Sequence, residues 1–185
     1  MQQPADWFFK IPSNLPENKV PPLFCAGITL YAPIARHAKP GDEVAVLGIG
    51  GLGHMGVQYA KAWGCKVTAF TSSKDKEEFI KKLGADRVVV GNAETYQQEA
   101  GKFDVVLNTL PSSENFSQYL GLTAPLGTFV QLGAPAFDKP AEINPASLIF
   151  GHVKFTGSGV GSRKETVEML EFSAKHNIVP LCEEF

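Results

Sequence analysis

Residues 44–53, which read Val-Ala-Val-Leu-Gly-Ile-Gly-Gly-Leu-Gly, decide the fold. A short apolar run leads directly into Gly48-x-Gly50-x-x-Gly53, and a helical pattern begins immediately after it. In such a strand–turn–helix unit the first glycine permits a tight turn, the second lets a pyrophosphate approach the backbone, and the third allows helix and strand to pack closely. Free N–H groups and the dipole at the start of the helix attract phosphate. The stretch therefore predicts dinucleotide binding; a glycine-rich turn that holds no ligand is the alternative.

The composition fits a soluble globular protein with one hydrophobic core. The 185 residues are 44% hydrophobic and 19% charged, and the net charge of −2 gives no electrostatic case for binding nucleic acid or an anionic membrane. No apolar run is long enough to span a membrane, and the N-terminal residues lack the pattern of a signal peptide. Three widely spaced cysteines argue against a disulfide framework and predict reduced thiols in the cytoplasm.

The chain alternates between apolar runs and amphipathic stretches. Residues 1–22 predict an extended lead-in, with a strand at residues 7–9 as one option, and residues 23–38 predict a helix. Runs rich in Val, Leu and Phe predict parallel strands at 44–47, 66–70, 87–90, 103–108, 127–132 and 153–156. The stretches between them predict helices at 51–63, 74–83, 93–100 and 112–120.

A last helix is predicted after the sixth strand. It begins with the capping-box pattern Ser162-Arg163-Lys164-Glu165 and places Val167, Leu170 and Ala174 on one face. The whole alternation predicts a Rossmann α/β fold: a doubly wound, six-stranded parallel sheet with helices on both faces, covering residues 23–185.

The end of the second predicted strand bears on the choice of cofactor. NAD-binding enzymes usually place Asp or Glu there, where the carboxylate hydrogen-bonds the ribose hydroxyl and repels a 2′-phosphate. This tip carries no acid; it carries three hydroxyl side chains and two nearby lysines, namely Thr71, Ser72, Ser73, Lys74 and Lys76. Hydroxyl and ammonium groups are suitable partners for a phosphate dianion. The pattern favours NADP(H) over NAD(H), although the hydroxyl residues would also suit a helix cap.

Several motifs, in order and at matching intervals, resemble those of the zinc-dependent medium-chain alcohol dehydrogenases, in the NADP-dependent branch similar to cinnamyl alcohol dehydrogenases. They are CAGIT at 25–29, GIGGLGHMG at 48–56, TSS at 71–73, LGAD at 83–86, LGAP at 132–135 and GSGVGS at 157–162. The resemblance covers nearly the whole chain. It implies hydride transfer between NADP(H) and a primary alcohol or aldehyde, whose oxygen a zinc ion polarises. It also implies a homodimer, joined where a short strand near residues 141–144 meets its copy.

The resemblance implies roles for particular residues. The pyrophosphate would lie on the loop formed by Gly48, Gly50, Gly51, Leu52 and Gly53, and the 2′-phosphate would contact Thr71, Ser72, Ser73 and Lys76. The nicotinamide side of the cleft would be lined by Thr29, Asn108, Thr109, Gly133, Ala134, Ser158 and Gly159. Cys25 would match the third protein ligand of the catalytic zinc.

The chain departs from the family in length, because members are about twice as long and their catalytic lobe precedes the part matched here. That lobe supplies the other zinc ligands, the proton-relay groups and a four-cysteine structural zinc site, none of which is found in this sequence. Cys25 alone cannot hold zinc, since three protein ligands are normally needed. We therefore expect zinc only in an intact two-domain enzyme, no catalytic residue in this chain, Cys25 as a buried thiol on a helix, and His54 as a neutral packing or surface residue.

Two functional hypotheses follow from the sequence. The first is the cofactor-binding domain of an NADP-dependent zinc alcohol dehydrogenase, inactive by itself; residues 1–22 would then include the remnant of the link to the catalytic lobe. The second is a stand-alone, non-catalytic module for NADPH binding or oligomerisation. An upstream extension that carries zinc ligands would favour the first, and a genuine start at Met1 would favour the second.

Overall fold

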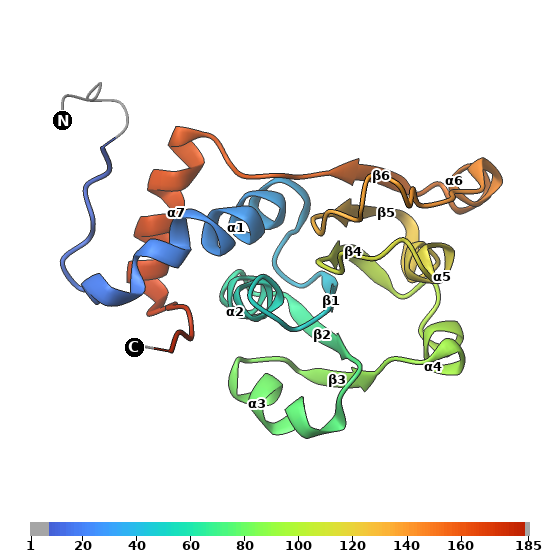
Figure 1. The fold of residues 1–185 in the computed structure, drawn as a ribbon, viewed down its shortest axis with the longest axis horizontal. Helices are drawn as coiled ribbons and strands as arrows, with labels where there is room; N and C mark the ends of the chain where they lie inside the picture. The colour runs from blue at the N-terminus through green and yellow to red at the C-terminus, as the bar shows by residue number, and fades with distance from the viewer. Residues whose placement is uncertain (1–7, 184–185) are drawn as a thin grey trace.

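Six parallel strands form the centre of the computed structural model, which describes residues 8–183 (Figure 1). The strands are β1 (Glu43–Leu47), β2 (Lys66–Thr71), β3 (Arg87–Val90), β4 (Phe103–Asn108), β5 (Thr123–Gln131) and β6 (Lys154–Gly157). They are ordered β3-β2-β1-β4-β5-β6, and every neighbouring pair is parallel. The direction of winding reverses between β1 and β4, so ligands are expected at the carboxyl ends of these two strands. The predicted Rossmann fold is confirmed.

Helices cover both faces of this sheet (Figure 1). On one face lie α1 (Ala26–His37), α2 (Gly53–Ala62), α3 (Glu77–Lys82) and α7 (Arg163–His176). On the other lie α4 (Ala93–Gln98), α5 (Phe116–Leu120) and α6 (Pro145–Gly151). No helix in the described part of the chain is long and apolar enough to cross a membrane.

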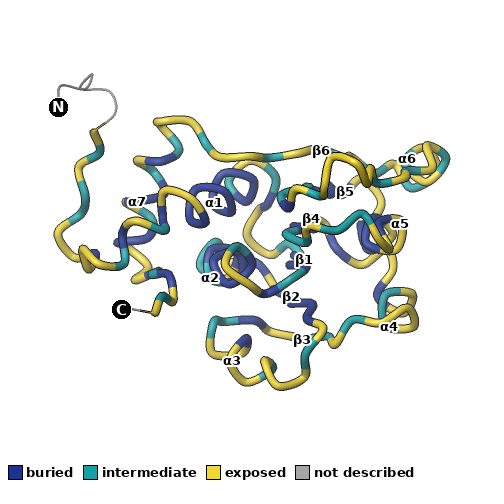
Figure 2. The backbone as a smooth tube through the Cα atoms, viewed as in Figure 1, coloured by how far each residue is buried: buried dark blue, intermediate teal, exposed yellow. Residues whose placement is uncertain are grey.

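The core has two halves because side chains alternate along each strand. In β1, Val44 and Val46 belong to the cluster under α1, α2 and α7, whereas Ala45 and Leu47 belong to the cluster under α5. All four side chains are fully buried. The continuous apolar run that predicted this strand is therefore explained by helices on both sides (Figure 2).

The lead-in differs from the extended segment that the sequence predicted. The described part, residues 8–22, includes a 3-10 helix η2 (Glu17–Lys19) and the start of a second, η3 (Pro21–Phe24). Leu15 and Val20 are buried in the same cluster as α1, and the Asn14 amide donates to the Ala174 carbonyl of α7. Phe8 and Phe9 form no strand, and the Phe9 ring packs against Phe24; Trp7 lies outside the described residues.

Two further expectations were wrong in detail. Residues 141–144 form no strand; they lie between two prolines, and Asn144 ends the segment by capping α6, a helix that the sequence did not predict. On α7, Leu170 and Ala174 are buried as expected, but Val167 is 38% exposed, and Met169 faces the core. The capping box at the start of α7 is confirmed, with Ser162 and Glu165 bonded reciprocally.

Candidate cofactor-binding site

The glycine loop between β1 and α2 has little room on its inner side and open space on its outer side. Gly48 has φ +82°, and a Cβ there would lie 2.6 Å from Leu110 Cδ2. A Cβ on Gly53 would lie 1.9 Å from the Gly48 carbonyl oxygen, so helix and turn are as close as the motif requires. A Cβ on Gly50 or Gly51 would meet nothing within 4 Å. The outer side can therefore accept a ligand directly against the backbone.

The first turn of α2 presents backbone donors on this open side. The Gly50 carbonyl accepts from the His54 amide, and the Leu52 carbonyl accepts from Met55 and Gly56. The amides of Gly51 and Leu52 donate to no group in the described part of the chain, and no side chain caps the helix. Free amides and the positive end of a ten-residue helix dipole suit a pyrophosphate.

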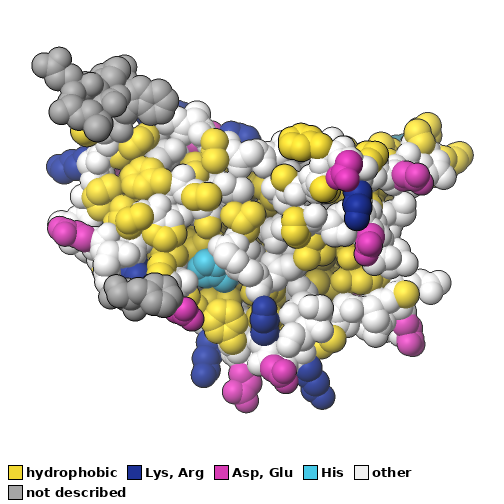
Figure 3. Space-filling model, in the orientation of Figure 1, with side chains coloured by type: hydrophobic (Ala, Val, Ile, Leu, Met, Phe, Trp, Pro, Cys, Tyr) yellow, Lys and Arg dark blue, Asp and Glu magenta, His cyan; other side chains and the backbone are white. Residues whose placement is uncertain are grey.

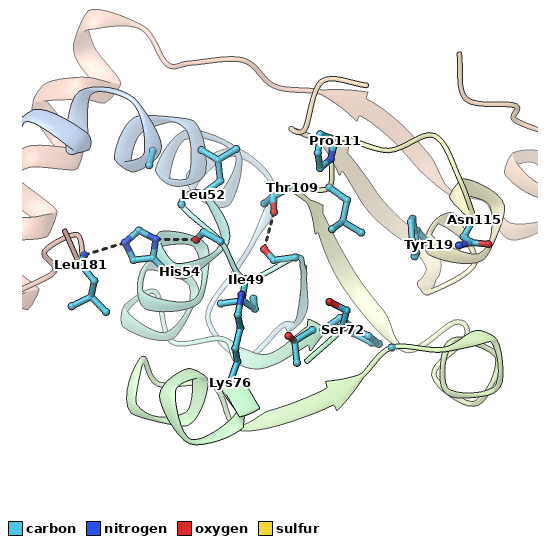
Figure 4. A pocket seen from close by; sticks show the side chains of 18 of the residues that line it. Ile49, Leu52, His54, Ser72, Lys76, Thr109, Pro111, Asn115, Tyr119 and Leu181 are labelled. Atoms are coloured by element: carbon cyan, nitrogen blue, oxygen red, sulfur yellow. Dashed lines mark hydrogen bonds between the residues drawn. The ribbon is translucent and has the colours of Figure 1, made fainter. Parts of the chain in front are cut away.

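A cavity of about 990 Å³ opens above this loop and extends along the carboxyl ends of the strands (Figure 4). It brings together residues from distant parts of the chain, including the glycine loop, the β2 tip, the ends of β3 and β4, and helices α4 and α5. The predicted residues that line it are Cys25, Gly48, Gly50, Gly51, Leu52, Thr71, Ser72, Lys76 and Thr109. Its position is where the winding order of the sheet predicts ligand binding.

At the β2 tip, two side chains are available to a ligand in this cavity. Ser72 and Lys76 are both exposed and both line it (Figure 4). Thr71 is buried, and its hydroxyl is engaged with the backbone of Ser73. Ser73 stands at the N-cap of the short helix η4 (Lys74–Lys76) without capping it through its side chain, and does not line the cavity. The capping alternative for these hydroxyls therefore receives no support from the structure.

The residues predicted at the nicotinamide side lie mostly outside the cavity. Thr29, Asn108, Gly133, Ala134, Ser158 and Gly159 do not line it. The fully buried Asn108 amide bonds Gln131 and the Leu110 amide. The Thr109 hydroxyl lies 2.8 Å from the carbonyl oxygens of both Leu47 and Gly48, so it fastens the glycine loop to the end of β4.

Ser158 differs from these structural residues. Its hydroxyl oxygen is buried and has no hydrogen-bond partner among the described residues. A buried hydroxyl without a partner costs free energy, which a bound polar ligand would recover. The hydroxyl oxygen of Thr123 is in the same state, and Ser158 does not line the cavity, so the fit to a dinucleotide rests on the open glycine loop and the β2 tip.

Cys25 is placed differently from the expectation. It is exposed at the N-cap of α1 rather than buried within a helix, because α1 begins only after the 3-10 helix η3. It lines the cavity, but no three His, Cys, Asp or Glu side chains of the described residues are grouped to hold a metal ion. These residues alone therefore do not fit a catalytic zinc site.

His54 connects the glycine loop to the C-terminal segment (Figure 4). It is 7% exposed, its Nδ1 lies 3.1 Å from the Gly50 carbonyl oxygen, and its Nε2 accepts from the Leu181 amide at 3.2 Å. Because Nε2 accepts, the ring proton lies on Nδ1 and donates to Gly50. His54 therefore packs between two segments, as expected, and it holds the glycine loop through Gly50.

Comparison with known proteins identifies the family. A family model described as zinc-binding dehydrogenase matches residues 51–175, from the glycine loop to the end of α7. The chain belongs to the zinc-binding dehydrogenases. Within this family, it is 41% identical over 177 residues to cinnamyl alcohol dehydrogenase 7 of Arabidopsis thaliana, covering 94% of this chain and 49% of the relative.

Solved zinc-binding dehydrogenases share the fold. A cinnamyl alcohol dehydrogenase from Sorghum bicolor superposes with a TM-score of 0.88 at 36% identity, over 95% of this chain and 50% of the other. The enzyme CAD from Helicobacter pylori, solved in complex with NADP(H), gives 0.86 at 32% identity over the same shares. The resemblance to the cinnamyl-alcohol-dehydrogenase-like branch is therefore confirmed, and the chain spans about half the length of the relatives it matches.

Proposed function

We propose that this chain binds NADP(H) and is the cofactor-binding domain of an NADP-dependent zinc alcohol dehydrogenase. One observation carries the proposal: the open glycine loop and an acid-free β2 tip with exposed Ser72 and Lys76 line the same cavity. A relative of the same fold was solved with NADP(H), which supports this choice of cofactor. The preference follows from charge, since an ammonium and a hydroxyl favour a 2′-phosphate and no carboxylate at the tip repels it.

Each part of the site has a separate task in this proposal. The amides of Gly51 and Leu52 would bind the pyrophosphate, and Ser72 and Lys76 would hold the 2′-phosphate. The buried Ser158 hydroxyl would donate to or accept from a polar group at the nicotinamide end. The bound cofactor supplies the hydride chemistry for a primary alcohol or aldehyde.

An exposed apolar surface beside the cavity is evidence that a second lobe packs here in the full enzyme. Exposed apolar side chains gather on the α1 and α7 side of the molecule (Figure 3), and they include Phe8, Phe24, Val160 and Leu181. Exposed patches of this kind commonly mark interfaces. Such a lobe would supply the zinc ligands that the described residues lack, with Cys25 at its border.

A homodimer is a further proposal. It is favoured by the exposed side chains of Phe150 and Phe155, close to the β6 edge of the sheet.

A second candidate function is a non-catalytic module that binds NADPH. The observation that favours it is the absence of a metal-binding group among residues 8–183. Both candidate functions use the same cavity, so a measurement of cofactor binding tests both of them. A measurement of turnover distinguishes the dehydrogenase domain from the non-catalytic module.

The experiment is a calorimetric titration of this chain with NADPH and, separately, with NADH. We expect saturable binding of both, with NADPH tighter. Tighter binding of NADH would overturn the choice of cofactor and leave the site in place. Binding of neither would overturn the proposed function for this chain.

A further inference from the structure

The cavity continues beyond the β2 tip into a part that is not used by the residues proposed to bind the pyrophosphate and the 2′-phosphate. This part, which we call the α4–α5 end, is lined by Gly91, Tyr96, Leu110, Asn115, Gln118 and Tyr119. In Figure 4, Asn115, just before α5, and Tyr119 in α5 lie across the cavity from Ser72. If NADP(H) binds as proposed, its pyrophosphate lies at the glycine loop and its 2′-phosphate at Ser72 and Lys76. The adenine ring is attached to the same ribose, and the α4–α5 end is the adjoining part of the cavity.

The wall of this end is aromatic. The Tyr96 ring stacks on Phe70 at 5.7 Å with an interplanar angle of 18°, and meets Tyr119 edge-on at 5.1 Å. A Cβ on Gly91 would lie 2.1 Å from the Tyr96 hydroxyl oxygen, so only glycine lets the phenol occupy this place. Burial raises the pKa of Tyr96 to about 12, and the neighbouring Tyr119 adds to the shift. The wall therefore offers a neutral aromatic surface to a flat ring.

Asn115, at the start of the same helix as Tyr119, has a side-chain amide that makes no hydrogen bond with the described residues. It occupies the N-cap of α5 in the left-handed conformation, at φ +59°, yet its side chain does not cap the helix. Asn92 and Asn144, which stand at the N-caps of α4 and α6, both cap with their side-chain oxygens. The Asn115 amide makes no hydrogen bond within the described part of the chain, and that of Gln118, three residues on, makes none either. Residues three apart on a helical turn share a face.

A side-chain amide matches one edge of adenine. Its oxygen accepts from the N6 amino group while its nitrogen donates to N7, which is the pairing that Asn and Gln make with adenine in other complexes. We propose that Asn115, supported by Gln118, reads the N6/N7 edge of the cofactor's adenine and makes this site selective for aminopurine nucleotides. The inference rests on the proposed binding of NADP(H).

The test compares NADPH with its deaminated analogue, in which hypoxanthine replaces adenine. Hypoxanthine presents two acceptors, O6 and N7, on this edge, so an amide can pair with only one of them. We expect the wild-type chain to bind NADPH roughly ten-fold more tightly than the analogue. Asn115→Gly removes the amide but keeps a residue that adopts φ +59° without strain, and should reduce the ratio of the two affinities to about one.

A matched control shows that the effect belongs to the site. Asn177 also has a positive φ, +54°, at the end of α7, and does not line the cavity. Asn177→Gly should keep the full ratio, and thermal melts of both variants confirm that they fold. If the wild type binds NADPH without preferring it over the analogue, or if Asn115→Gly keeps the ratio, the inference is overturned while the proposed function stands. If the wild type does not bind NADPH, the proposed function itself has failed, and the inference with it.

Discussion

Ser72 is the residue on which the proposed preference for NADP(H) depends most directly. It is exposed in the cavity at the β2 tip, and Lys76 lines the same wall. Ser72→Asp would place a carboxylate beside the 2′-phosphate, so we expect NADPH binding to weaken roughly ten-fold or more through like-charge repulsion. NADH binding should stay equal or become tighter, because the carboxylate can accept from the ribose hydroxyl. Calorimetric titration of both cofactors measures the change.

The uncharged variant Ser72→Asn separates charge from size. It has nearly the volume of the Asp variant but no negative charge, so it should lose much less affinity for NADPH. Equal losses in the two variants would mean that crowding, rather than charge, governs this position. An unchanged NADPH affinity in Ser72→Asp would remove the β2 tip from the 2′-phosphate site.

Leu126 is a strained residue outside the site. It lies within β5 at φ +67° and is 69% exposed, where the register against β4 shifts between Phe103 and Val105. A branched apolar side chain in the left-handed region costs about 1 kcal/mol, and Asn tolerates it better. We expect Leu126→Asn to raise the free energy of unfolding by about 1 kcal/mol, measured by urea denaturation. Leu126→Ala keeps the strain and should leave the midpoint nearly unchanged; equal midpoints for the two variants would contradict the explanation.

Residues of the candidate site could be predicted from the sequence where they belong to a short contiguous motif. The glycines and the hydroxyl-rich tip lie in contiguous stretches, so the sequence located the loop and the acid-free strand end. Asn115 and Tyr96 left no local signal, because they reach the cavity only through the packing of α4 and α5. The exposure of Cys25 could not be predicted from the sequence either, since it depends on where η3 ends and α1 begins.

At the scale of elements, the start of α7 is fastened to the end of α1 by one carboxylate. Glu165 closes the capping box with Ser162 and forms a bidentate ion pair with Arg36, at 2.7 and 2.8 Å. These partners, Arg36 first, lower the pKa of Glu165 from 4.5 to about 2. A lowered carboxyl pKa stabilises the folded chain above the ordinary pKa, and this contribution is lost as the pH falls towards the folded-state pKa.

Glu165→Gln keeps the hydrogen-bonding shape but removes the charge. We expect it to lower the free energy of unfolding by about 1 kcal/mol at neutral pH, with the difference from wild type shrinking as the pH falls from 4.5 towards 2. Urea denaturation over this pH range measures it. Glu168→Gln is the matched control, because its pair with Lys164 is long, 3.7 Å, and exposed, so it should change stability by less than about 0.5 kcal/mol. A pH-independent deficit in Glu165→Gln would refute the electrostatic explanation.

The strands were more predictable than the helices and loops around them. Parallel strands buried on both faces give continuous apolar runs, and β3 and β4 have the predicted bounds. Helix α6 was missed because Pro145 suggested a loop, whereas proline is well suited to the first turn of a helix whose cap is Asn144. The error at Val167 follows from the crossing of α7 over α1, which turns Met169 and Leu170 inward. Such crossing geometry is a tertiary property.

For the whole molecule, the sheet gathers the candidate cofactor-binding residues, but the described residues hold no complete zinc site. The loops at the carboxyl ends of β1, β2, β3 and β4 converge on one cavity. Of the predicted zinc ligands, only Cys25 is present, and no three metal-binding side chains group together in residues 8–183. Under the proposed function, binding and turnover are therefore separable: binding would need only the cavity, and turnover would need a metal with its substrate position.

We accordingly expect the chain to bind NADPH and to reduce no aldehyde, with or without added zinc. The measurement follows nicotinamide absorbance with a panel of aliphatic and aromatic aldehydes, using a preparation in which calorimetry has already shown NADPH binding, so that inactivity cannot arise from misfolding. Zinc should leave the rate at background, because a single exposed thiol cannot fix the open tetrahedral geometry that polarises a carbonyl. Zinc-dependent turnover would show that two or more copies of the chain, or residues outside the described range, complete the metal site. Zinc-independent turnover would contradict the expectation that the reaction needs a metal to polarise the substrate oxygen.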